Sequence, residues 1–223
     1  MVAVLHCAVP PPAALLSAAA VACSHLLAMN DVGPGTLELM AADLWEDGAY
    51  DEACAGASCF IHTAAELGTL EGQTPQRVYD SGFEATQHVL ASAAKSGTVK
   101  RFIYTSSNAA IYHPGKPKPS WHGEGYFTEN DWGDDDDWGG TMVSAAAPFG
   151  SSFRSLKEAA AQTRDNIPKI RDVAYCFSKC DVERYLYEEG PKHGIDCMSV
   201  QPCHVIGPLL CAAHQTPHMW QTK

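Results

Sequence analysis

The sequence has no lysine or arginine before Arg77, no C-x-x-C pair, and no unbroken apolar run long enough to cross a membrane. A secretory signal peptide carries basic residues ahead of its apolar stretch, so the alanine-rich start of this chain does not fit one. A membrane-spanning helix needs about 20 apolar residues, whereas prolines at positions 10–12 interrupt this segment. We therefore expect neither a targeting peptide nor a membrane role.

Positive charge is scarce along the whole chain: 15 Lys and Arg stand against 26 Asp and Glu, a formal net charge of −11 over 223 residues. Non-specific nucleic-acid binding needs clustered cations, so we expect no nucleic-acid partner. The nine cysteines lack zinc-motif spacing, and the aspartates at 134–137 lack the spacing of a calcium loop, so we expect no metal site. Thiols scattered through apolar segments indicate a reducing compartment, and we expect the cytoplasm.

From residue 37 onward, short apolar segments alternate with helical patterns. Strands are predicted within 37–44, 57–65, 99–107 and 195–202, and helices over 46–56, 74–97 and 171–190. Such alternation indicates a parallel sheet with crossover helices, an α/β fold. The irregular stretch at about 113–170 is predicted to be a loop insertion that contains a short surface helix at 151–166.

Polar or small residues follow the predicted strands. They are Asp43, residues 62–65, residues 105–107, and residues from Pro202 onward. Ligands of parallel α/β sheets bind beyond the carboxyl ends of the strands, so we place the candidate site at this edge.

A tyrosine and a lysine, Tyr175 and Lys179, lie four positions apart in the predicted helix 171–190. Residues at this spacing share one helix face. Taken alone, the pair also fits an amphipathic helix with a part-buried tyrosine and a solvated lysine.

Four segments, in this order, resemble the extended short-chain dehydrogenase/reductase family (NAD-dependent epimerase/dehydratase type). The similarity is greatest to the branch that holds dihydroflavonol reductases, cinnamoyl-CoA reductases and 3β-hydroxysteroid dehydrogenases. The segments are AADL (41–44), HTAA (62–65), VKRFIYTSSNAAIY (99–112) and the stretch from AYCFSK to GPLL (174–210). The resemblance implies a Rossmann-like doubly wound parallel sheet. It also implies an NAD(P)-dependent oxidoreductase that transfers hydride between nicotinamide and a carbonyl or secondary alcohol of a small molecule.

The resemblance assigns a catalytic set of Ser107, Tyr175 and Lys179. A nearby ammonium favours the phenolate, so Lys179 is expected to lower the pKa of Tyr175 from its ordinary value of about 10. Tyr175 would exchange a proton with the substrate oxygen, Ser107 would orient that oxygen, and Lys179 would also bind the nicotinamide ribose. Two alternatives stay open: Ser107 can be a strand-end serine that caps backbone groups, and Ser106 takes its place if the register shifts by one.

The resemblance also implies a cofactor site, for NADP or NAD with NADPH favoured. Its residues are Asp43 and Leu44 near the adenine, Thr63, Ala64 and Ala65 near the phosphates and ribose, Tyr175 and Lys179, and Pro202 and His204 beside the nicotinamide. Substrate contacts are expected from the variable loop, foremost from Tyr112 and His113, with Trp121 and Phe127 as further aromatic candidates. A homodimer through the helices at 77–96 and 171–190 would follow the family habit.

The N-terminal part departs from the family pattern. The family's first strand leads into a G-x-x-G-x-x-G turn whose backbone amides bind pyrophosphate. Here VAVLHCAVPPPAALL (2–16) offers a strand-like start but then places prolines, which have no amide donor. We expect an atypical apolar segment at 1–23, an incomplete reductase domain at 24–210, and the start of a missing substrate lobe at 211–223, so that both ends look truncated. The alternative function is a catalytically impaired relative that acts as a binding or scaffold protein without cofactor.

Overall fold

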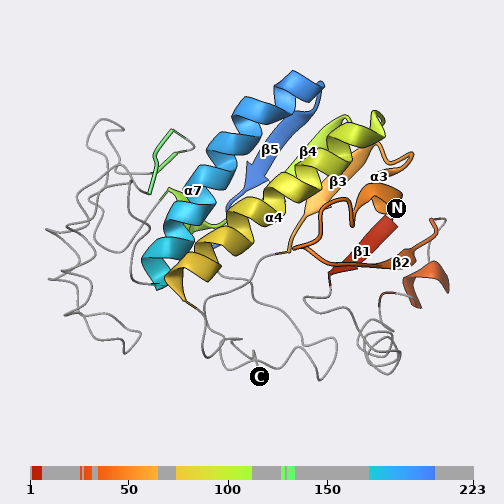
Figure 1. Cartoon of the computed structure of the whole chain (residues 1–223), viewed down its shortest axis with the longest axis horizontal. Coiled ribbons are helices and arrows are strands. Elements are labelled where there is room, and N and C mark those ends of the chain that lie inside the picture. Colours follow the sequence, from red (N-terminus) through yellow and green to blue (C-terminus); the bar gives the residue numbers. More distant parts are fainter. Residues whose placement is uncertain are drawn as a thin grey trace, which may run out of the picture.

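The computed structural model describes a set of parallel strands and helices, drawn in Figure 1. The described residues are 2–6, 26, 28–31, 35–64, 74–111, 127–128, 130–133 and 171–203. The strands are β1 (Val2–His6), β2 (Glu38–Ala42), β3 (Cys59–His62), β4 (Arg101–Thr105) and β5 (Asp196–Val200). The helices are α3 (Asp51–Cys54), α4 (Pro75–Ser96) and α7 (Arg171–Glu189), with 3-10 turns η1 (Ala28–Asp31), η2 (Asn108–Ala110) and η4 (Gly190–His193).

The strands form two parallel sheets. β1 pairs with β2, and β4 lies between β3 and β5 in the second sheet. The strands β2 to β5 all fall within the predicted apolar segments, which confirms the predicted parallel α/β architecture. The strand-like start of the chain is also a strand, because Val2–His6 pairs in register with Glu38–Ala42.

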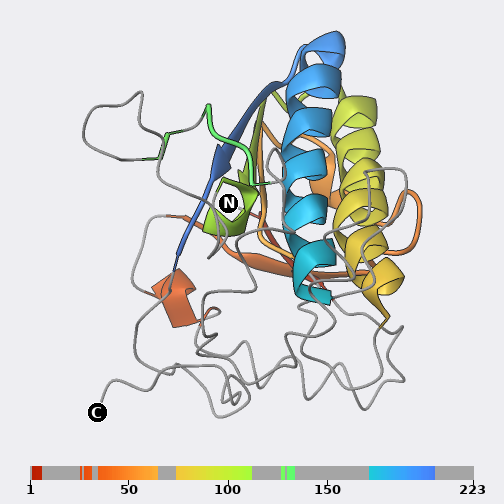
Figure 2. The same cartoon turned by 90° about the vertical axis from the view of Figure 1, so that its left-hand side faces the viewer.

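The two long helices lie side by side on one face of the three-stranded sheet, as the edge view in Figure 2 shows. Side chains that alternate toward this face are buried, among them Phe60, Phe102 and Tyr104. Side chains on the opposite face are more open, and Ile61 keeps 57% of its surface exposed. The sheet is therefore packed on the helical side, and its core is built there.

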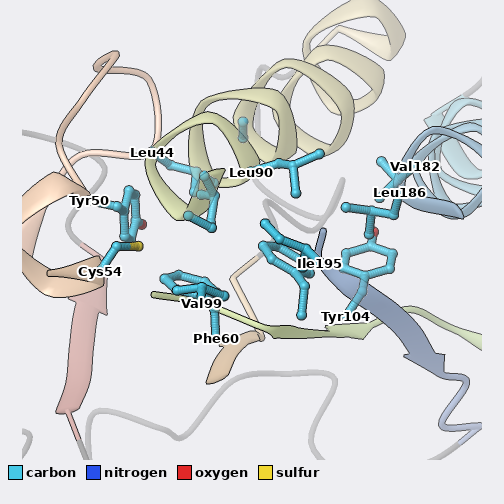
Figure 3. Packing of buried hydrophobic residues seen from close by; sticks show 14 of the residues in the cluster. Leu44, Tyr50, Cys54, Phe60, Leu90, Val99, Tyr104, Val182, Leu186 and Ile195 are labelled. Carbon is cyan, nitrogen blue, oxygen red and sulfur yellow. The ribbon is translucent and has the colours of Figure 1, made fainter. Parts of the chain in front are cut away.

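The core centres on aromatic side chains that the strand register brings together. Phe60 pairs with Phe102 across β3 and β4, and their rings stack at 5.4 Å. Leu90 of α4 and Leu186 of α7 close the cluster from the helical side (Figure 3). Full burial of one such side chain contributes roughly 1.5–3 kcal/mol.

Helix α4 begins and ends where its sequence predicts. The Thr74 hydroxyl accepts a hydrogen bond from the Arg77 amide at 3.2 Å, and Pro75 occupies the first turn. Gly97 ends the helix in the left-handed region with φ +66°. A glycine inside this helix, Gly82, faces Ser178 so closely that a Cβ there would overlap the serine hydroxyl. This close crossing explains a glycine in a helix interior, where glycine is normally unfavourable.

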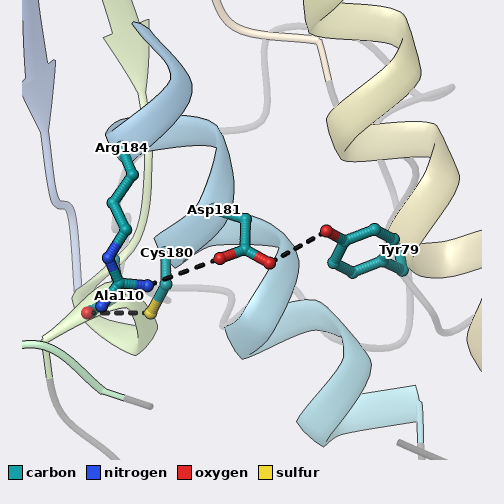
Figure 4. A network of polar contacts seen from close by, with 5 residues as sticks. All are labelled: Tyr79, Ala110, Cys180, Asp181 and Arg184. Atoms are coloured by element: carbon teal, nitrogen blue, oxygen red, sulfur yellow. Dashed lines mark hydrogen bonds and ion pairs between the residues drawn. The ribbon is translucent and has the colours of Figure 1, made fainter. Parts of the chain in front are cut away.

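Polar contacts fix α7 to its neighbours, as shown in Figure 4. The Tyr79 hydroxyl of α4 donates to Asp181 at 2.9 Å, and Arg184 binds the other oxygen of that carboxylate at 3.4 Å. The Cys180 thiol donates to the Ala110 carbonyl at 3.2 Å. Helix α7 is thus held both to α4 and to the turn that follows β4.

One helix is shorter than predicted. The sequence pattern predicts a helix over 46–56, but α3 covers only Asp51–Cys54. Gly48 has φ +78°, outside the helical region, and the residues before α3 form a series of turns. The surface helix predicted at 151–166 lies outside the described residues. None of the helices in the described ranges combines the length and hydropathy that a membrane span requires.

Candidate active site

The carboxyl ends of β4 and β5 continue as a hydrogen-bonded ladder beyond the strands. The Ser106 amide donates to the Val200 carbonyl at 2.9 Å, and the Asn108 amide donates to the Pro202 carbonyl at 3.1 Å. These bonds hold Ser107 between two fixed backbone positions at the edge of the sheet. The predicted site edge therefore contains an ordered serine.

Ser107 makes two interactions, one of which is the backbone cap that the sequence left open. Its hydroxyl oxygen accepts a hydrogen bond from the Ala109 amide at 3.2 Å and so caps η2. It also hydrogen-bonds with the phenol of Tyr175, which lowers the pKa of that phenol. Ser106 is 4% exposed, and its hydroxyl has no hydrogen-bond partner among the described residues. The contact with Tyr175 favours Ser107 over Ser106.

Lys179 of α7 lies beside the carboxyl end of β4, and its side chain is buried, with 3% of the residue exposed. Its ammonium donates to the Thr105 carbonyl at 3.0 Å. The nitrogen lies 4.6 Å from the centroid of the Tyr104 ring and 5.6 Å from that of Tyr175. Tyr175 and Lys179 thus share one face of α7, and the structure brings both together with Ser107.

The pKa values of this pair follow from burial. Desolvation lowers the pKa of Lys179 to about 8, and the charge of Glu183 opposes this change. Desolvation raises the pKa of Tyr175, and the hydrogen bond with Ser107 opposes that rise. The expected lowering of the Tyr175 pKa by Lys179 is therefore wrong for this arrangement, because burial of the phenolate dominates and the ammonium is directed to a backbone carbonyl. Near neutral pH the phenol keeps its proton and is in the acid form.

At the end of β2, the two predicted adenine neighbours differ. The Asp43 carboxylate is half-buried and accepts a hydrogen bond from the Trp45 amide at 2.9 Å. Leu44 is fully buried in the hydrophobic core, so its side chain packs with Tyr50 and Leu90 instead of lining the edge. The expected packing of Leu44 beside an adenine ring has no support in this placement.

The remaining predicted cofactor and substrate residues fall into two groups. Thr63 is exposed and Ala64 is half-buried just beyond β3, and Pro202 is half-buried beyond β5. Phe127 is half-buried. Outside the described residues lie Ala65, His204, Tyr112, His113 and Trp121.

Two polar residues beside the site are absent from the sequence-based set. Glu183 is 2% exposed, and the Gln201 side-chain amide donates to both of its carboxylate oxygens at 3.0 Å. Glu183 follows Lys179 by four positions, so the helical period was a signal that could have identified it. Nothing comparable in the sequence links Gln201 to the helix.

Residues 25–132 match the model of the 3-beta hydroxysteroid dehydrogenase/isomerase family. This part of the chain is therefore similar to that family, and the match covers just under half of the chain. Over 177 residues the chain is 26% identical to dihydroflavonol 4-reductase of Hordeum vulgare. This alignment covers 79% of this chain and 40% of that protein. The chain is also 27% identical over 186 residues to cinnamoyl-CoA reductase CAD2 of Medicago truncatula. This alignment covers 83% of this chain and 47% of that protein. The chain spans less than half the length of these curated relatives.

A solved structure shows the same fold. The crystal structure of yeast methylglyoxal/isovaleraldehyde reductase Gre2 complexed with NADPH superimposes with a TM-score of 0.60 at 18% identity. The alignment covers 88% of this chain and 52% of that one. Together the comparisons confirm the predicted resemblance to the reductase family and the predicted Rossmann-like fold.

Proposed function

We propose that this chain contains the catalytic part of a nicotinamide-dependent oxidoreductase that acts on a carbonyl or secondary alcohol. The observation that supports this function is the convergence of Ser107, Tyr175 and Lys179 at the carboxyl edge of the sheet. The family match and the reductases among its relatives support the same reaction class.

Each of the three side chains has a role that follows from its position. The Tyr175 phenol donates its proton to the substrate oxygen, and its raised pKa keeps that proton available near neutrality. The Ser107 hydroxyl orients the same oxygen through a hydrogen bond. The Lys179 ammonium, held by the Thr105 carbonyl beside the phenol, binds the nucleotide. A bound reduced nicotinamide supplies the hydride.

The nicotinamide end of the site fits such a cofactor. An ammonium has three N–H donors, and the hydrogen bond from Lys179 to the Thr105 carbonyl uses one of them. The same group can therefore also serve a ribose hydroxyl. The pyrophosphate end fits less well, because the sequence before Asp43 contains no G-x-x-G-x-x-G turn. We propose NADPH as the first cofactor to test, since the yeast reductase was crystallised with it, and NADH as the second.

Nucleotide titration of the purified chain tests this proposal. Binding of NADPH or NADH, followed by calorimetry, is expected for the natural sequence and weaker by about tenfold for Lys179→Met. The matched control is Lys95→Met, a change on the exposed face of α4, which should bind as the natural sequence does. Absence of binding for both nucleotides would overturn the proposal, as would equal binding by Lys179→Met.

Turnover gives the second arm of the test. Small aromatic and aliphatic aldehydes and ketones form the substrate panel, because the names of the barley and yeast reductases contain such carbonyl compounds. Tyr175→Phe removes the phenolic hydroxyl and its proton. This change should lower kcat by about 10²–10⁴-fold and leave nucleotide binding intact. Equal turnover by this variant would remove Tyr175 from the reaction. We propose the cytoplasm as the compartment of this activity, since Cys54, Cys176 and Cys180 are buried cysteines that form no disulfide within the described residues.

A further inference from the structure

A buried glutamate lies one helical turn beyond the site lysine. Glu183 is 2% exposed and follows Lys179 on the same face of α7. Burial of a carboxylate is unfavourable unless hydrogen bonds and an opposite charge compensate it. The surroundings of Glu183 provide both.

The hydrogen bonds of Glu183 come from the end of β5 and from its own helix. The Gln201 amide donates to both carboxylate oxygens at 3.0 Å and also to the Ser199 hydroxyl at 3.1 Å. The Tyr187 hydroxyl donates to one carboxylate oxygen at 3.5 Å. Helix α7 is therefore joined by side chains to the residue that directly follows β5.

This junction leads on to the site serine. Gln201 precedes Pro202, whose carbonyl accepts the amide of Asn108 at 3.1 Å. Asn108 is the neighbour of Ser107 in sequence. A single carboxylate is thus connected to the backbone on which Ser107 sits, and it lies one turn from Lys179.

We propose that Glu183 is a positioning residue that keeps the Lys179 ammonium charged in its buried place and, through Gln201, holds segment 201–203 against the strand end that carries Ser107. This inference rests on the proposed function for its catalytic meaning. The two contacts themselves can be measured without it.

The groups around Lys179 show why Glu183 supplies the balancing charge. Tyr175 faces Lys179 from the same helix and Tyr104 from β4, and both tyrosines have raised pKa values that keep them neutral. The thiol of Cys180 is directed to a backbone carbonyl. From α4, Tyr79 binds Asp181 on another part of α7. Glu183 is the group whose charge raises the pKa of Lys179 against the effect of burial.

The charge is tested with Glu183→Gln, which keeps the side-chain shape. The ammonium signal of Lys179 is titrated by NMR in the full chain labelled at lysine, with Lys179→Arg used for assignment. Its pKa should fall by about one unit in Glu183→Gln. The matched control, Glu188→Gln, removes an exposed carboxylate from the same helix and should leave that pKa unchanged. A Lys179 pKa that stays constant in a folded Glu183→Gln chain would overturn the proposal.

The contact with segment 201–203 is tested separately, with Gln201→Met. This variant keeps the carboxylate but removes its amide donor. Hydrogen exchange at the Asn108 amide should become about tenfold faster, while the Asp196 amide, bonded to the Lys100 carbonyl at 2.9 Å at the other end of β5, should exchange as before. Unchanged exchange at Asn108 would overturn the positioning role even if Glu183→Gln did not fold. Both measurements use no nucleotide and no turnover, so a chain that failed to bind NADPH would still give a result.

Discussion

The three-stranded sheet with α7 and the pair β1–β2 differ in how much of a candidate site their sequences reveal. At the ends of β4 and β5, the candidate chemistry belongs to side chains, and a motif of Ser107, Tyr175 and Lys179 makes it visible in the sequence. After β1 the resemblance predicts a glycine turn with backbone amides that bind phosphate, and the sequence has prolines at positions 10–12 instead. Side-chain chemistry can therefore be assigned residue by residue, whereas a phosphate site made of backbone depends on a loop conformation.

The same two regions differ in burial, and this gives the largest predicted effect. Phe102 is fully buried in the central strand β4, whereas Met40 in β2 is half-buried. Phe102→Ala should lower the free energy of unfolding by about 3–5 kcal/mol, because it leaves a cavity beside Phe60. Met40→Ala should cost about 1 kcal/mol, in proportion to its smaller buried area. Urea denaturation measures both, and equal losses would show that the β2 region belongs to the core as fully as β4 does.

The buried lysine gives the next effect, which depends on pH. The pKa of Lys179 is about 8 in the folded chain and about 10.4 when unfolded. Between these values the unfolded state binds more protons, so the free energy of unfolding rises with pH. Relative to Lys179→Met, which has no titrating group, the natural chain should gain about 2–3 kcal/mol from pH 7 to pH 10.5. Denaturation series at both pH values measure the difference, and a pH-independent difference would mean that Lys179 is solvated.

Much of this fold follows from local signals in the sequence. The apolar segments predict β2 to β5, and Thr74 and Gly97 mark both ends of α4. The short length of α3 does not follow, because the backbone at Gly48 is left-handed and the pattern of apolar residues carries no such information. The burial of Leu44 also escapes local reasoning, since its cluster includes Leu90 of α4, which is distant in sequence.

The candidate site, like the fold, is predictable from the sequence in part. The family resemblance and the spacing of Tyr175 and Lys179 predict which side chains meet, and the structure brings them together with Ser107. The raised pKa of Tyr175 is not predictable from the motif, because it depends on how deeply the phenol is buried. The bond between Glu183 and Gln201 joins a helix to the end of a strand, and only tertiary structure reveals such a pair.

Helix packing next to the site gives a smaller effect. Gly82→Ala would place a methyl group against Ser178, whose hydroxyl donates to the Tyr79 carbonyl at 3.1 Å. The serine must rotate and lose that bond, while alanine gains helix propensity, so the net loss in unfolding free energy is about 1–2 kcal/mol. The double variant with Ser178→Ala should recover part of this loss. A stabilised Gly82→Ala chain in thermal denaturation would show that α4 and α7 are not tightly apposed at this point.

The smallest effect belongs to an ion pair at the amino end of the same sheet. Arg101 of β4 binds Asp196 of β5 at 2.8 Å, and both side chains are more than half exposed. Water and salt screen such a pair, so Arg101→Ala should change the unfolding free energy by less than about 0.5 kcal/mol, and less still in high salt. Chemical denaturation at two salt concentrations measures this, and a salt-independent loss above about 1 kcal/mol would contradict it. Because Arg101 and Thr105 occupy opposite ends of one strand, a near-zero result here beside a strong pH effect at Lys179 would place the electrostatic sensitivity of this sheet at its carboxyl edge, where the candidate chemistry lies.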